Sequence, residues 1–158
     1  TATAQEKRIY EMSQIGKVSK EKPEKLGFKH LVTLVQCGKT DDLNEESKVR
    51  AEKIKNWLEK YASKDFKFEV QDKVKVKVSK KQKEALFALK ESLSVKDFTE
   101  DELFNEFYTI CEAVGIKNNE FFQGAYSVII DKTRGPRLAA LILAVGKDRI
   151  VKLLDEVK

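Results

Sequence analysis

Two copies of a helix-start signal constrain the fold of this chain more than any other feature. Ser79 is followed three residues later by Gln82, and Thr99 is followed at the same spacing by Glu102. In such a capping box each side chain bonds a free backbone N–H of the other residue at the start of a helix. Apolar residues recur at helical spacing after both boxes. The boxes therefore predict two helices, which begin directly after Ser79 and Thr99.

Glycines divide most of the remaining chain into further helices. Gly38, Gly115 and Gly146 each follow an apolar helical stripe, and glycine takes the left-handed conformation that ends a helix at little cost. We expect early helices over about residues 3–14, 28–37 and 43–62, and later ones up to residue 157. The first apolar stripe, from Phe28 to Val35, is wide enough to predict a buried helix. The fold class is therefore all-α, a helical bundle or α-helix cage of about seven or eight helices.

Three more helix starts are predicted from single residues. Asp41 or Asp42 is expected to cap the third helix, because a short polar side chain accepts from the free N–H groups there. Asn118 or Asn119 is expected to do the same for the sixth helix. Pro136 is expected in the first turn of the seventh helix, where a missing N–H is not needed.

One stretch has the period of a strand instead of a helix. Apolar residues alternate with polar ones at Phe66, Phe68 and Val70, and again at Val74, Val76 and Val78. We interpret residues 66–78 as a short extended segment, and leave open a hairpin that turns at residues 71–73. This segment predicts a division into a helical connector subdomain over 1–64, an extended linker over 65–79 and a helix-cage subdomain over 80–158.

Charge is unevenly spread along the chain, which has 158 residues and a net charge of +5. Residues 100–131 contain seven acidic residues and one basic residue, whereas residues 132–158 contain seven basic and three acidic residues. A protein that turns one face toward a polyanion has such asymmetry. No catalytic set is predicted, because His30 is the single histidine and no base lies near a nucleophile.

Cofactor, metal and membrane sites find no support in the sequence. Cys37 and Cys111 lack zinc-ligand spacing and are expected to be free thiols. Neither GxxxxGK[ST] nor GxGxxG occurs. The longest uncharged apolar run, residues 138–146, is too short to span a bilayer. We expect no cofactor or metal in this chain, no membrane partner, a cytoplasmic location and a monomer.

A basic corner is the strongest candidate for a binding site. Arg134 and Arg137 enclose a Gly-Pro pair at the start of the predicted seventh helix, where free N–H groups and the helix dipole favour an anion. Lys132 adds a further positive charge. Tyr126 is expected near this turn, either as a core residue or as a platform on which an unpaired base stacks. A solvated surface is the alternative for both arginines.

These residues also belong to stretches that resemble a known family. Residues 8–14 (RIYEMSQ), 28–36 (FKHLVTLVQ), 121–126 (FFQGAY), 135–138 (GPRL) and 145–151 (VGKDRIV) are similar to the C-terminal part of class I, archaeal-type lysyl-tRNA synthetases. The resemblance implies an anticodon-binding region whose partner is the anticodon stem-loop of lysine tRNA. The two catalytic signatures of the class are absent from this chain, so ATP and magnesium are expected only for a catalytic domain outside it.

The resemblance also implies which residues meet RNA. A looser likeness links the corner to the end of bacterial glutamyl-tRNA synthetases, in which a corner of this type contacts anticodon bases. The matching positions here are Gly135, Pro136 and Leu138. An arginine nine residues before that corner also contacts bases in those relatives, and Tyr126 stands at the matching position here, which favours stacking over hydrogen bonding to a base edge.

Two rival functions remain open at this point. A helical protein-interaction module without RNA binding predicts a contiguous exposed apolar groove. A free-standing tRNA-binding protein derived from a synthetase predicts the same RNA site without a ligase around it.

Overall fold

The computed structural model of the protein describes residue 4 and residues 26–157. Within 26–157 it contains seven helices and no strand, which confirms the all-α prediction. The helix expected over residues 3–14 lies outside the described residues, apart from residue 4. The helices are α2 (Phe28–Gln36), α3 (Glu45–Lys60), α4 (Lys80–Val95), α5 (Glu100–Val114), α6 (Asn118–Ile130), α7 (Leu138–Val145) and α8 (Lys147–Asp155).

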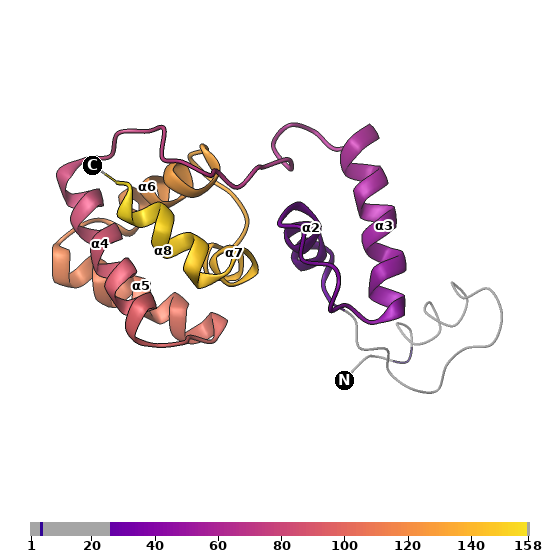
Figure 1. Ribbon diagram of the computed structural model, residues 1–158, viewed down its shortest axis with the longest axis horizontal. Coiled ribbons are helices and arrows are strands. Elements are labelled where there is room, and N and C mark those ends of the chain that lie inside the picture. Colours follow the sequence, from indigo (N-terminus) through magenta and orange to yellow (C-terminus); the bar gives the residue numbers. More distant parts are fainter. Residues whose placement is uncertain (1–3, 5–25, 158) are drawn as a thin grey trace.

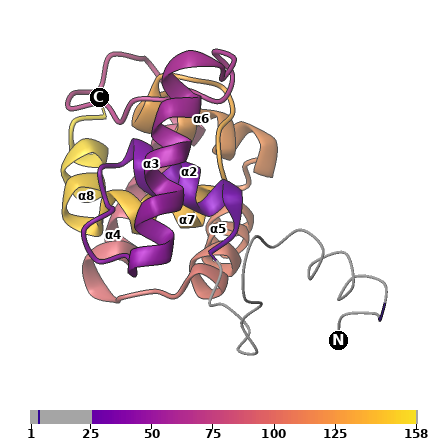
Figure 2. The ribbon, with the colours of Figure 1, turned by 90° about the vertical axis from the view of Figure 1, so that its right-hand side faces the viewer.

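The helices form two groups, as Figure 1 shows. Helices α2 and α3 pack side by side as a helix pair, and α4–α8 pack around one another as a five-helix unit. The pair meets the unit through a contact of α2 with α7, and a view turned by 90° shows the pair in front of the unit (Figure 2). Each group has its own cluster of buried apolar side chains.

The predicted capping boxes are both present. The Ser79 and Thr99 side chains accept from the backbone N–H groups of Gln82 and Glu102, and both reciprocal bonds form. Gly115 ends α5 in the left-handed conformation with φ 66°, and Gly38 follows α2 at φ 68°. Gly146 ends α7 as predicted.

Three predicted helix starts are wrong. Asn44, not Asp41 or Asp42, caps α3 by accepting from the N–H of Ser47. Helix α6 has Lys117 at its N-cap, without a side-chain bond, so neither Asn118 nor Asn119 caps it.

Pro136 lies outside α7, which begins at Leu138 with Arg137 at the N-cap. The chain between α6 and α7 is thus longer than predicted, and the Gly-Pro pair belongs to this loop and not to the helix.

The predicted burial of α2 is only partly present. Leu31, Val32 and Thr33 are buried, whereas Phe28 is 48% exposed. A periodic stripe shows which side chains can be buried, but the partners available in the fold decide how many are. Here α2 packs on α3 and also contacts α7.

The segment predicted to be extended connects the two groups and contains no helix. We call residues 65–79, the extended linker of the sequence analysis, the connector; the name does not refer to the helical subdomain predicted over 1–64. It runs along one edge of the five-helix unit toward α4 (Figure 1). The hairpin left open at residues 71–73 does not form, because the backbone bonds of the connector go to other elements. The N–H of Gln71, for example, donates to the carbonyl of Ile129 at 2.8 Å.

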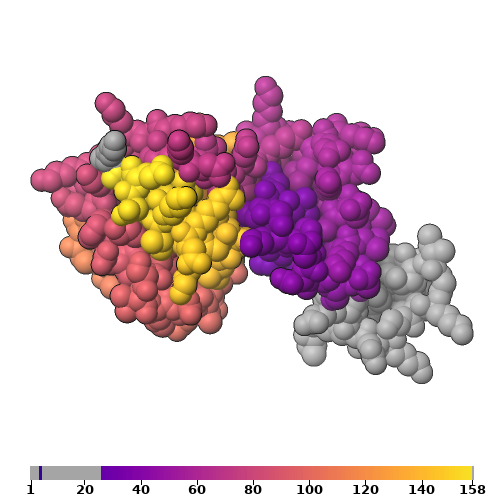
Figure 3. Space-filling model, viewed as in Figure 1, coloured from indigo at the N-terminus to yellow at the C-terminus, as the bar shows by residue number. Residues whose placement is uncertain are grey.

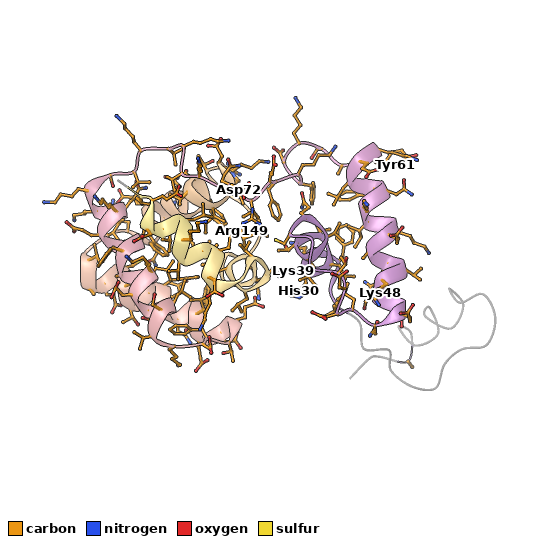
Figure 4. All side chains as sticks on the ribbon, viewed as in Figure 1. His30, Lys39, Lys48, Tyr61, Asp72 and Arg149 are labelled. Carbon is orange, nitrogen blue, oxygen red and sulfur yellow. The ribbon has the colours of Figure 1, made fainter. Side chains whose placement is uncertain are left out.

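Side chains from both groups hold the connector. The Gln36 amide donates to the carbonyl of Phe66 at 3.0 Å and accepts from the N–H of Phe68 at 2.8 Å. Arg149 bonds the carboxylate of Asp72 at 2.7 Å, and Figure 4 shows this pair on the side of the unit that faces the connector. The connector is therefore held in place by side chains of both groups and is not a free linker.

Among the described helices, none combines the length and the apolar character that crossing a membrane requires.

Candidate nucleic-acid interface

A cleft of about 910 Å³ lies where the helix pair meets the five-helix unit. Helix α2 and the start of the connector form one wall. The loop between α6 and α7 and the start of α7 form the other wall. Figure 3 shows the two groups meeting along a boundary through the middle of the molecule. The loop contributes Arg134, Gly135, Pro136 and Arg137, which we call the corner. The cleft therefore contains the basic corner that the sequence singles out.

Close packing against α6 fixes the shape of the corner. A Cβ atom on Gly135 would lie 2.7 Å from Cδ1 of Ile130 and 3.2 Å from two ring carbons of Tyr126. No larger residue fits there without a shift of its neighbours. The Tyr126 hydroxyl donates to the carbonyl of Pro136 at 2.5 Å. Both ends of this side chain therefore support the corner.

This placement makes Tyr126 a packing residue rather than an open platform. Its side chain is half-buried and belongs to the edge of the main apolar cluster. Burial raises the pKa of its phenol, and the nearby backbone N–H of Leu138 offsets part of that rise. The hydroxyl is therefore a neutral donor at physiological pH.

Lys132 is used within the fold. Its ammonium donates to the carbonyls of Lys64 at 2.8 Å and Lys67 at 2.5 Å. These bonds tie the start of the connector to the loop that follows α6. Lys132 lines the cleft, but its ammonium is already bonded to two carbonyls of the opposite wall, so it links the two walls.

The two arginines differ in what they contact. Arg137 lies 3.3 Å from the carboxylate of Glu100 at the start of α5, and both side chains are solvent-accessible. Arg134 is exposed, lines the cleft and forms no ion pair with the described residues. Arg134 is therefore the corner cation with the most freedom to meet an incoming anion.

The opposite wall carries two aromatic rings that the sequence interpretation assigned elsewhere. Phe28 and Phe66 both line the cleft and are each 48% exposed. Trp57 lies between them, with ring centroids 5.5 Å from Phe28 and 5.4 Å from Phe66, both in edge-on geometry. Trp57 holds the two rings in place while each keeps an open side, as a base-stacking surface requires.

Sequence reasoning missed these two rings because both fit an apolar pattern. Phe28 begins the stripe of α2, and Phe66 begins the alternating segment. A usable signal was available, since both rings stand at the first position of their element. A residue at an element end has neighbours on one side only, so it is buried less completely.

The remaining predicted residues have smaller parts in the cleft. Leu138 is 3% exposed and belongs to the main apolar cluster, so it offers no side-chain surface to a ligand. His30 is half-buried on α2 and lines the cleft beside Lys29. Asp65 and Glu100 are the acidic residues of the lining. Basic side chains outnumber them, which favours an anionic ligand.

The described part of the chain offers little for other chemistry. Cys37 and Cys111 are free thiols, as predicted. Burial raises the pKa of Cys37 to about 11, which keeps that thiol protonated at neutral pH. Residues 26–157 contain no group of three metal-ligating side chains.

Comparison with known proteins identifies the kind of domain. Residues 43–158 match the family described as "Anticodon binding domain", which includes α3–α8 and the corner. The chain belongs to this anticodon-binding family.

Two lysine–tRNA ligases are similar to most of this chain. The lysine–tRNA ligase of Borrelia garinii subsp. bavariensis is 33% identical over 168 residues, which include 95% of this chain and 32% of that protein. The lysine–tRNA ligase of Thermococcus kodakarensis is 31% identical over 94% of this chain and 32% of that protein. The anticodon-binding chain described here thus spans about a third of the length of these relatives.

Proposed function

We propose that this chain binds the anticodon stem-loop of lysine tRNA within a class I lysine–tRNA ligase. The ligase would join lysine to its tRNA with ATP, in the cytoplasm, and the chain would act as a monomer. The observation that carries the proposal is the cleft, where two half-exposed phenylalanines face a basic corner. Its family membership and the names of its relatives support the same function.

Each wall would recognise a different part of the RNA. Unpaired bases would stack on Phe66 and Phe28, because every base offers a π face to an aromatic ring. Arg134 and Arg137 would contact phosphates or base edges from the other wall. Tyr126 would position the corner and not contact a base directly. The predicted contacts at Lys132, Gly135, Pro136 and Leu138 would then act mainly through the shape of the corner.

ATP and magnesium belong to the proposed ligase, but the described residues do not fit a site for them. No trio of His, Cys, Asp or Glu side chains converges in residues 26–157, and the sequence contains no phosphate-cradling glycine loop. We therefore assign both to a part of the ligase outside this chain.

The proposal is tested by exchanging one aromatic ring. Phe66→Leu keeps an apolar side chain but removes the stacking surface, so it should weaken binding of lysine tRNA about 5- to 150-fold, the range expected for one stacked base. Phe104→Leu is the matched control, because Phe104 is 47% exposed but lies on α5 and does not line the cleft.

Binding is measured with a lysine tRNA transcript and with the same transcript carrying an altered anticodon. The unmodified chain should prefer the lysine anticodon, and Phe66→Leu should weaken the binding of both transcripts, because stacking does not depend on which base is present. Equal losses for Phe66→Leu and Phe104→Leu, or no preference in the unmodified chain, would contradict the proposed function.

A further inference from the structure

A second basic surface lies at the other end of the connector. Residues 73–83 contain six lysines and no acidic residue, and we call them the lysine segment. We propose that the lysine segment is a separate binding site for the sugar-phosphate backbone of RNA. The inference rests on the proposed function for the identity of the RNA, since it would be the tRNA whose loop occupies the cleft.

In the first half of the segment, half-buried apolar side chains alternate with exposed lysines. Val74, Val76 and Val78 are half-buried and pack against the apolar cluster of the five-helix unit. Lys73, Lys75 and Lys77 alternate with these valines and are all exposed. Figure 4 shows long, nitrogen-tipped side chains that point into solvent along this edge. The valines therefore fasten the backbone, and the lysines are left on the outer side.

The backbone of the segment is held at several points. The N–H of Val74 donates to the carboxylate of Glu156 at 3.3 Å. Just before it, Arg149 bonds Asp72 at 2.7 Å and the carbonyl of Val70 at 3.3 Å. Ser79 ends the connector in a capping box with Gln82. RNA would therefore meet lysines carried on an ordered protein backbone, so little backbone entropy would be lost on binding.

The charges in this row are not neutralised within the described residues. None of Lys73, Lys75 and Lys77 forms an ion pair there, and the nearby Asp72 is already paired with Arg149. Three lysines at alternate positions place three positive charges along at most about 14 Å of chain. Neighbouring lysines are then at most about 7 Å apart along the chain, which is less than the screening length of about 8 Å at physiological salt. A polyanion would relieve this repulsion.

The start of α4 repeats this preference for lysine. Its first turn has no acidic residue and begins with Lys80 and Lys81, although acidic residues favour the positive end of the helix dipole. Helix α5, by contrast, has three acidic residues in its first turn. Lys81 also donates to the carbonyl of Gly115. Lys81 therefore has a structural role at the end of α5. Stability alone would favour an acidic residue at position 80, so Lys80 is better explained by an anionic partner.

The cleft lies at the start of the connector, and the lysine segment begins near its other end. The connector begins in the cleft with Asp65 and Phe66, and Figure 1 shows it crossing the five-helix unit before it reaches α4. RNA held in the cleft by its loop could thus be held a second time through the phosphates of its stem. Lysine contacts to phosphates carry no sequence information, so this second contact would add affinity without selectivity.

The test is a triple variant of the 158-residue chain that removes three positive charges, Lys73→Gln with Lys75→Gln and Lys77→Gln. Affinity for lysine tRNA and for the anticodon-altered transcript is measured over a range of salt concentrations. The slope of log K against log salt should become shallower by about 2.7, at roughly 0.9 per lost phosphate contact of a double-stranded stem. Affinity for both RNAs should fall by the same factor, so the anticodon preference should stay unchanged.

The matched control is Lys53→Gln with Lys55→Gln and Lys60→Gln, three exposed lysines of α3 that lie outside the cleft lining. It removes the same net charge and should leave the slope unchanged. An unchanged slope in the first variant, an equal change in both variants, or a loss confined to one RNA would overturn the inference. These outcomes differ from failure of the proposed function, in which the unmodified chain shows no anticodon preference.

Discussion

Gly135 is constrained by space and not by its backbone angles, since its φ is not in the left-handed region. Gly135→Ala would push a methyl group to 2.7 Å from Ile130, which is buried. We expect the free energy of unfolding to fall by about 1–3 kcal/mol, the usual cost of overpacking, as measured by chemical denaturation.

Gly27→Ala is the control for this prediction, because a Cβ atom on Gly27 would meet nothing within 4 Å. Gly27 is the N-cap of α2, where glycine is favoured over alanine, but alanine also lowers the entropy of the unfolded chain. The two effects oppose each other, so the free energy of unfolding should change by no more than about 0.5 kcal/mol. If both variants were equally stable, the close approach of the corner to α6 would not constrain residue 135.

The site was predictable from sequence as far as it depended on residue type. Arg134, Gly135, Pro136 and Arg137 do line one cleft. The sequence left open whether Tyr126 is a core residue or a stacking platform. The answer depends on a hydrogen bond to Pro136, ten residues away, which no local pattern encodes. The position of Phe66 opposite the corner likewise depends on how the helix pair meets the five-helix unit, and this is a property of tertiary packing.

At the scale of elements, the connector depends on Gln36. The side chain of this one residue satisfies the carbonyl of Phe66 and the N–H of Phe68. Gln36→Ala should lower the free energy of unfolding by about 1–3 kcal/mol, because both groups lose a partner. Hydrogen exchange at the Phe68 amide should become faster. Gln71→Ala is the control, since that side chain only bonds the carbonyl of Glu69, two residues away, and it should leave the Phe68 amide protected.

The capping box of α5 should make stability depend on acid pH. The backbone N–H of Thr99, together with Lys96, lowers the pKa of Glu102 from 4.5 to about 2. A carboxylate with a lowered pKa stabilises the fold above pH 4.5, and this contribution is lost as the pH falls toward 2. Glu102→Gln can keep the box but cannot titrate, so its unfolding midpoint should vary less over this range.

Glu112→Gln serves as the control for the acid series, because Glu112 is exposed on α5 and forms no ion pair with the described residues. It should follow the pH dependence of the unmodified chain. Identical pH profiles for Glu102→Gln and Glu112→Gln would contradict the assignment. Thermal denaturation at a series of pH values from 2 to 7 makes the comparison.

Helix boundaries were predicted well where both partners of a cap are local in sequence. The boxes at Ser79 and Thr99 are of this kind, and so is the end at Gly115. The start of α3 was misplaced because Asp41, Asp42 and Asn44 are all competent caps, and only the path of the loop selects Asn44. Pro136 was misplaced for a similar reason. Gly135 packs closely against α6, and α7 begins only at Leu138, after the Gly-Pro pair.

At the scale of the whole molecule, the two groups of helices differ in how much apolar surface they bury. Among residues 26–157, the apolar cluster of the helix pair has four buried residues, Leu31, Val32, Ile54 and Leu58, whereas the cluster of the five-helix unit has twenty-four. Local opening is easiest where few apolar contacts must break. In native-state hydrogen exchange, amides of α2 and α3 should therefore open at a free energy about 2 kcal/mol or more below those of α4–α8. Uniform protection would contradict the predicted division near residues 64 and 79.

The same experiment with RNA separates the two proposed contacts. The cleft has α2 as one wall and α7 as part of the other, so tRNA bound there should stabilise the pair against opening. At a free RNA concentration 100 times Kd, linkage gives about 2.7 kcal/mol, or roughly 100-fold slower exchange in α2. RNA held only by the lysine segment would contact the five-helix unit and the connector alone, and would leave exchange in α2 unchanged. Protection of α2 by lysine tRNA, and its loss in Phe66→Leu, would therefore place the anticodon loop between the two groups.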